Sequence, residues 1–130
     1  MFASLFVLLY VAHLLSDYPL QTDRQASCKA DKTAAGWRAN LLHAGTHVLV
    51  SAVVLAIAAL ALDLNLSTPT AIAGLLWIGA SHSLIDRRWP IRWWMEHTGQ
   101  KVFMQHGGMA HVDQTAHVTA LLIAALGLAA

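Results

Sequence analysis

The stretch GASHSLIDRRWP, residues 79–90, places a histidine and an aspartate in an apolar segment and follows them with two arginines. His82 and Asp86 are four residues apart, so in an α-helix both side chains lie on one face. An apolar helix normally excludes such residues, because burying an unpaired polar group is costly. Taken alone, the pair is best explained by hydrogen bonds to neighbouring helices.

The composition points to a membrane protein. The 130 residues are 57% hydrophobic and 12% charged, which is about half the charged share of a typical soluble domain. The net charge of +1 names no partner, and we expect the lipid bilayer rather than nucleic acid to surround the chain. One cysteine, Cys28, excludes an internal disulfide framework. The N-terminal segment lacks the basic start of a secretory signal, so we expect a retained membrane helix.

Four apolar segments predict an all-α membrane protein that forms one four-helix domain over residues 1–130. The expected transmembrane helices are about 2–18, 41–62, 70–86 and 112–130, each near the roughly 20 residues that a bilayer requires. All eight Lys and Arg residues lie in the two longer connections. The positive-inside rule then predicts that both connections are cytoplasmic and both termini lie outside, in a bacterial inner membrane.

The second basic connection predicts a short interfacial helix near residues 90–97. Pro90 suits the first turn of a helix, and Arg92 can pair with Glu96 one turn later. The tryptophans at 89, 93 and 94 suit the lipid headgroup layer. They are equally consistent with an aromatic belt that has no chemical role.

Each apolar segment carries one pair of ionisable residues four positions apart. The pairs are His13 with Asp17, His43 with His47, His82 with Asp86, and Asp113 with His117. In the predicted orientation all four pairs lie within about two helical turns of the cytoplasmic face. His and Asp are common metal ligands, and a cation offsets the cost of carboxylates in a membrane. We expect these eight residues to bind divalent metal, as two Zn, Mn or Fe ions.

Two other interpretations of the pairs stay open. Polar side chains can hydrogen-bond across membrane helices without any ion, and facing histidines can ligate haem. Around the pairs, Gln21 and Gln114 are candidates to orient ligands, or they are capping and loop residues. No role is assigned to Cys28 or to the histidines at 97, 106 and 111.

A weak internal repeat relates the two halves of the chain. HLLSD (13–17) and HSLID (82–86) share a pattern, and HAGTHV (43–48) and DQTAHV (113–118) align at nearly the same offset. We therefore expect two helical hairpins related by a pseudo-twofold axis along the membrane normal. Such an arrangement would place all four pairs around one centre.

These motifs resemble an uncharacterised family of small multi-pass bacterial and phage membrane proteins, domain of unknown function 3307. That family combines H-x3-D-x3-Q, H-x3-H, H-x-x-I-D followed by a basic residue, and D-Q-x-x-H. The matching residues here are His13, Asp17 and Gln21; His43 and His47; His82, Ile85 and Asp86; and Asp113, Gln114 and His117. The resemblance covers nearly the whole chain and implies no reaction. The basic position is often Lys in that family, whereas Arg87 and Arg88 stand here.

The first functional hypothesis is a metal-dependent hydrolase that acts on a lipid or membrane-embedded substrate at the cytoplasmic face. Asp113 is the candidate base, and Arg87, Arg88 and Arg92 could hold an anionic headgroup. The alternative is a non-catalytic metal protein: a metal or proton carrier, or a phage accessory protein whose ions fasten the helices. The apolar outer halves of the segments count against a transmembrane pathway. An interaction module within a host membrane complex is a third hypothesis.

Overall fold

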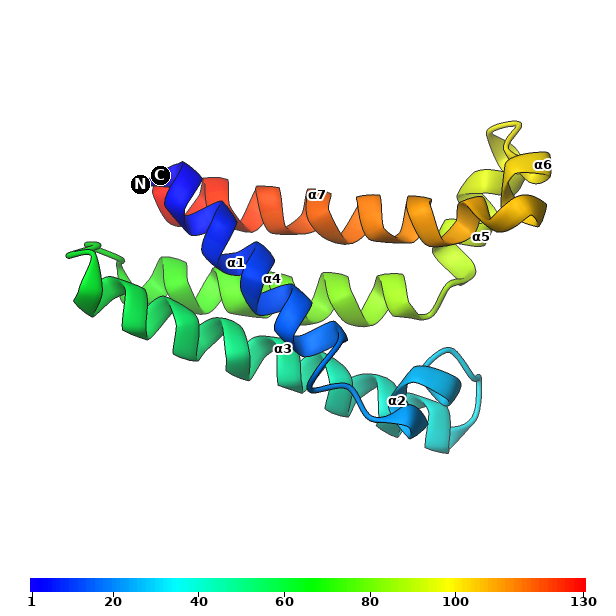
Figure 1. Ribbon diagram of the computed structural model, residues 1–130, viewed down its shortest axis with the longest axis horizontal. Helices are drawn as coiled ribbons and strands as arrows, with labels where there is room; N and C mark the ends of the chain where they lie inside the picture. Colours follow the sequence, from blue (N-terminus) through cyan, green and yellow to red (C-terminus); the bar gives the residue numbers. More distant parts are fainter.

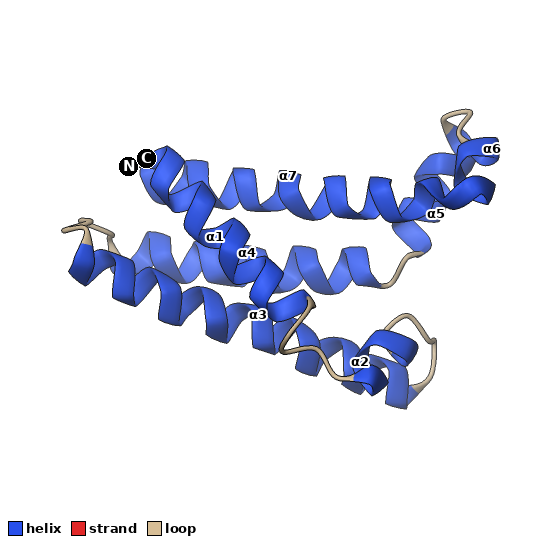
Figure 2. Ribbon diagram, in the orientation of Figure 1, coloured by secondary structure: helices blue, strands red, loops and turns tan.

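All 130 residues are described by the computed structural model, which contains helices and no strands (Figure 2). In chain order the elements are α1 (Phe2–Asp17), α2 (Asp23–Cys28), α3 (Ala34–Ala61), α4 (Thr68–Asp86), α5 (Trp89–His97), α6 (Lys101–Phe103), η1 (Met104–Gly108) and α7 (Met109–Ala129). The four long helices α1, α3, α4 and α7 form the bundle, and the short ones lie in the two basic connections. The all-α prediction is confirmed.

The four long helices form a ring in which each helix packs against two neighbours. α1 contacts α3 and α7, and α4 also contacts α3 and α7. The expected hairpins, α1 with α3 and α4 with α7, thus both pack as neighbours, and the pseudo-twofold axis between them stays a prediction. Both termini and the α3–α4 turn lie at one end of the bundle, whereas α2, α5 and α6 lie at the other (Figure 1). We call these the terminal end and the basic end.

Local sequence explains where α3 and α4 begin. The hydroxyl of Thr33 accepts a hydrogen bond from the backbone N–H of Gly36, and Ser67 caps α4 in the same way through Thr70. α3 begins several residues before the apolar segment predicted from residue 41. Residues 34–40 contain no proline, so the helix extends back to the Thr33 cap.

The predicted interfacial helix is present as α5. Ile91 and Met95 are buried against the bundle, whereas the three tryptophans at 89, 93 and 94 are exposed. α5 packs on α4 and α7. Arg92 and Glu96 are both exposed, and no ion pair joins their side chains, so the expected pair is absent. After α6, a kink with Gly107 at φ +91° turns the chain into α7.

Two helices, rather than the four expected, are long and apolar enough to cross a membrane. They are Ala34–Ala61 and the continuous helical stretch Lys101–Ala129, a finding that rests on length and composition alone. α1 is apolar but has only 16 residues. α4 has 19 residues, but polar side chains at both of its ends lower its mean hydropathy. The expectation of four spans is corrected on these grounds.

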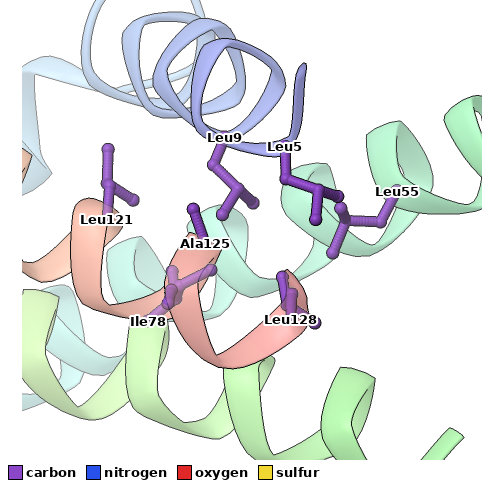
Figure 3. Close-up of a cluster of buried hydrophobic side chains, with 8 residues drawn as sticks. Leu5, Leu9, Leu55, Ile78, Leu121, Ala125 and Leu128 are labelled. Atoms are coloured by element: carbon purple, nitrogen blue, oxygen red, sulfur yellow. The ribbon is translucent and has the colours of Figure 1, made fainter. Parts of the chain in front are cut away.

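The apolar core occupies the terminal end of the bundle, and all four long helices contribute to it (Figure 3). Its fully or nearly fully buried members are Leu5, Leu9, Leu55, Ile78, Leu121, Ala124, Ala125 and Leu128. Small residues on α7 allow the leucines of α1 to pack closely against that helix. This core fixes the spacing of the helices and so determines how the polar residues of the basic end meet.

Truncation of Leu9 tests the role of this core. Leu9 is fully buried, so Leu9→Ala is expected to lower the free energy of unfolding by about 2–5 kcal/mol, because it leaves a cavity. Leu60→Ala is the matched control, since Leu60 is 89% exposed. Denaturant unfolding followed by circular dichroism measures both, and equal effects of the two substitutions would contradict the assignment of the core.

Candidate metal centre

Toward the basic end, the interior of the bundle is filled by ionisable side chains instead of leucines. Seven of the eight predicted ligands are buried there, none more than 9% exposed, and they come from all four long helices. They are His13, Asp17, His43, His47, His82, Asp86 and His117. The predicted convergence of the pairs is thus present in the structure for seven residues.

Asp17 lies at the centre of the first group. Its Oδ1 is 3.1 Å from Nε2 of His43 and 3.1 Å from Nε2 of His47, both on α3. The same oxygen is 3.8 Å from Nε2 of His82 on α4, and Oδ2 is 3.1 Å from Nε2 of His13. One carboxylate from the end of α1 therefore faces imidazoles from three helices.

Asp86 has the equivalent place on α4. Its Oδ2 is 3.1 Å from Nε2 of His82 and 3.6 Å from Nε2 of His43. Its Oδ1 is 3.8 Å from Nε2 of His117 on α7. Because His43 and His82 face both carboxylates, the two groups form one continuous cluster.

Several buried nitrogen atoms in the cluster lack a well-formed hydrogen bond. Nε2 of His13 and of His82 lie 3.1 Å from carboxylate oxygens without hydrogen-bond geometry, and Nε2 of His117 has no hydrogen-bond partner. Buried polar atoms are nearly always paired, so a set of unpaired ones that face each other requires an explanation. A metal ion is a direct one, because imidazole nitrogens and carboxylate oxygens are its usual ligands.

Two sets of ligand atoms are close enough to hold an ion, with all atoms of a set within 4.8 Å of one another: Asp17, His43, His47 and His82; and His82, Asp86 and His117. A tetrahedral ion with bonds of about 2.0–2.1 Å would separate neighbouring ligand atoms by roughly 3.3 Å. The 3.1 Å contacts around Asp17 are close to that value. The buried cluster could therefore bind metal.

Asp113 lies outside both sets of ligand atoms, and its expected role as base stays a prediction. Its Oδ2 is 3.4 Å from Nδ1 of His117, which also lies 3.0 Å from the Asp113 carbonyl. The side chain is 23% exposed and belongs to neither set of ligand atoms. His43 takes the corresponding place in the first hairpin and has a longer side chain, which reaches the centre. Asp113 thus orients His117 from behind, as carboxylates do for metal-binding histidines.

The two glutamines lie near the cluster in different ways. Gln21 donates from Nε2 to the backbone carbonyl of Asp17, so it caps the end of α1 and does not contact the carboxylate. Gln114 is half-buried and lines a pocket of about 470 Å³ together with Asp113, Tyr18 and Arg88. This pocket lies at the basic end, beside Asp113, and none of the seven buried His/Asp residues lines it.

Arg87 is not free to hold a headgroup. It is only 6% exposed, and its guanidinium donates hydrogen bonds to the backbone carbonyls of Lys29, at 2.9 Å, and Asp31, at 2.7 Å. It also lies over the ring of Trp37, 4.1 Å from the centroid. Arg87 therefore fastens the loop after α2 to α4. Arg88 and Arg92 are exposed, and their expected headgroup contact stays a prediction.

Two contributors to the cluster were missed by sequence reasoning. Lys29, in the loop after α2, places Nζ 3.0 Å from Oδ2 of Asp86. No helical spacing marks a loop residue, so the sequence carried no signal for it. Asn40 is fully buried and donates to the backbone carbonyl of Ser83, which joins α3 to α4. Its position three residues before His43 on the same face was an available signal.

The remaining histidines lie outside the cluster. His97 stacks on Trp93, His106 bonds the carbonyl of Val102, and His111 stacks on Phe103, all at exposed positions. The thiol of Cys28 donates to the carbonyl of Arg24. None of these four residues reaches the ligand atoms of the centre.

Fold and site together define an all-helical bundle with a buried His/Asp candidate metal centre. The chain belongs to the family described as Protein of unknown function (DUF3307), whose model matches residues 5–130. That range includes every residue of the cluster and confirms the resemblance seen in the motifs. Neither the curated proteins nor the solved structures contain a match to this chain.

Replacement of Arg87 tests its role in holding the loop. The ammonium group of lysine cannot donate to both carbonyl oxygens in the planar geometry of a guanidinium. Arg87→Lys is therefore expected to speed amide hydrogen exchange of residues 29–33 about tenfold or more, since a hydrogen bond to a charged group contributes about 1.5–3 kcal/mol. Arg92→Lys is the control, because the side chain of Arg92 is exposed and makes no hydrogen bond, although its backbone N–H donates to Arg88. Unchanged exchange in Arg87→Lys would contradict this role.

Proposed function

We propose that this protein is embedded in a membrane and binds divalent metal in the buried His/Asp cluster. The observation that carries the proposal is the convergence of five imidazoles and two carboxylates, with facing unpaired atoms, inside an otherwise apolar bundle. Zinc is our first candidate, because mixed imidazole and carboxylate ligands at these spacings suit it, and Mn and Fe have similar ligand preferences.

The exposed surface of the bundle supports the membrane part of the proposal. The core helix of a soluble protein is mostly buried, whereas only 28% of the most apolar window of each candidate spanning helix is buried here. Large apolar side chains point outward along all four long helices, among them Val7, Leu49, Leu60, Leu76 and Leu126. α1 and α4 pack along the candidate spans and so lie at the same depth. The basic end, rich in Lys and Arg, would face the cytoplasm of a bacterial inner membrane.

The packing of the cluster supports a metal ion over the two alternatives. The imidazole rings lie against one another, with centroids 3.5 Å apart for His47 and His82 and 4.4 Å apart for His82 and His117. This spacing leaves no slot among them for the flat macrocycle of a haem. Hydrogen bonding between helices alone leaves Nε2 of His117 without a partner, since Oδ1 of Asp86 is 3.8 Å away.

Metal content tests the proposal. The wild-type chain, extracted from the membrane fraction with detergent, is expected to carry at least one divalent ion per molecule by elemental analysis. His47→Ala is expected to lose most of that metal, because His47 contacts Asp17 directly. His97→Ala, an exposed histidine outside the cluster, is the control. Metal-free wild type would overturn the metal centre, and recovery in the soluble fraction would overturn the membrane assignment.

The activity that we propose for this centre is hydrolysis of a lipid or membrane-embedded ester. A set of three protein ligands, His82, Asp86 and His117, leaves an ion with an open position, as in catalytic zinc sites. A pocket of about 470 Å³ lies beside Asp113, which contacts His117, and Arg88 is part of its wall, so this pocket is the candidate place for a headgroup. A bound divalent ion would supply Lewis-acid activation of water and of a phosphoryl or carbonyl oxygen.

A non-catalytic role is the second candidate, and the burial of every ligand favours it. The Asp17 set offers four protein ligands, which is the arrangement of structural zinc sites. In that case the ion would fasten the basic end of the bundle, where the leucine core is absent. A metal or proton carrier, or an accessory or interaction protein of a phage or host membrane complex, would fit the same geometry.

Turnover separates the two candidates. The metal-loaded wild type is expected to hydrolyse at least one member of a panel of fluorogenic phospholipid and phosphate esters. Asp113→Asn is expected to reduce kcat about 10- to 100-fold while metal content falls little, because Asp113 contacts His117 and not the ion. Arg92→Gln, an exposed site on α5, is the control. A metal-loaded protein without metal-dependent turnover on the panel would support the non-catalytic role.

A further inference from the structure

We infer that Lys29 serves as a built-in cation on Asp86, so that the resting centre holds one divalent ion and not two. This inference rests on the proposed metal binding. It places the single ion in the set of Asp17, His43, His47 and His82, and so favours the non-catalytic candidate. It departs from the expectation of two ions, which was made from the four pairs before the position of Lys29 was known.

The contact places a positive charge where a second ion would bind. Nζ of Lys29 is 3.0 Å from Oδ2 of Asp86, and the two side chains are 12% and 5% exposed. The same oxygen is 3.1 Å from Nε2 of His82, whereas Oδ1 is 3.8 Å from Nε2 of His117, so the ammonium lies on the Asp86 oxygen that is closer to its set of ligand atoms. A divalent ion beside this ammonium would be strongly repelled in a buried setting.

The loop that carries Lys29 is held in place by several independent contacts. Arg87 bonds the carbonyls of Lys29 and Asp31, and it stacks on Trp37 of α3. A Cβ at Gly36 would collide with the carbonyl oxygen of Asp31, so the loop backbone lies directly against α3. Lys29 is thus aimed at Asp86 by the fold and is not a surface side chain that happens to lie near.

The ligand count gives the same result. His82 belongs to both sets of ligand atoms, but its Nε2 has one lone pair and can bind one ion at a time. If His82 joins Asp17, His43 and His47, that set has the four ligands of a closed site. Only Asp86 and His117 then remain for a second ion, and with water they could hold it only if Lys29 did not already compensate Asp86.

The number of ions per chain tests the inference. The detergent-solubilised protein is loaded with excess Zn²⁺, freed of unbound metal by gel filtration and analysed for zinc and protein. The wild type is expected to hold one ion per chain and Lys29→Gln two. Lys32→Gln is the matched control, since Lys32 is an exposed lysine of the same loop, and it is expected to hold one. Lys29→Arg keeps the charge and is expected to stay at one.

The outcomes separate this inference from the proposed function. A wild type without zinc would overturn the metal centre itself, and the inference with it. Two ions in the wild type, or one ion in Lys29→Gln, would overturn only the role of Lys29. If Lys29→Gln does not fold, Arg87→Gln gives a second test, because it frees the loop while Lys29 is kept. Its zinc content is expected to rise above one, and a ratio that stays at one would count against the inference.

Discussion

The carboxylate of Asp17, set among imidazoles from three helices, is the interaction on which the basic half of this bundle depends. Its two oxygens lie 3.1 Å from nitrogens of His13, His43 and His47. A buried carboxylate without partners would be too costly to tolerate, and five imidazoles without an acidic partner would have few acceptors. Each group makes the burial of the other possible. The leucine core at the terminal end supplies the apolar packing that this half of the bundle lacks.

The two basic connections meet at the centre, although the chain separates them widely. The loop after α2 brings Lys29 to Asp86, and the residue that follows Asp86 holds that loop through two backbone carbonyls. Two adjacent residues thus have linked roles. Asp86, the last residue of α4, is a ligand candidate, and Arg87, which follows it, fastens the loop that carries Lys29.

Most of the helical architecture could be predicted from the sequence. The apolar segments gave the four long helices, and Pro90 with the tryptophans gave α5. The His/Asp pairs identified seven of the buried polar residues, because a spacing of four residues fixes a shared helix face whatever the tertiary structure. The number of spans was overestimated, since α1 is short and α4 is polar at its ends. The start of α3 was misplaced, because apolarity marks a membrane segment and not the helix that continues beyond it.

What the sequence by itself determined is the set of helices, the face that each presents and the end of the bundle to which the pairs belong. These properties follow from local spacing and from the distribution of charge. Only the tertiary structure decided which carboxylates reach the centre, that Asp113 stands behind His117, and that Arg87 holds a loop. It also brought Lys29 to Asp86 across many intervening residues. Such contacts depend on side-chain length, on helix spacing set by the leucine core and on the path of a loop, none of which has a periodic signature.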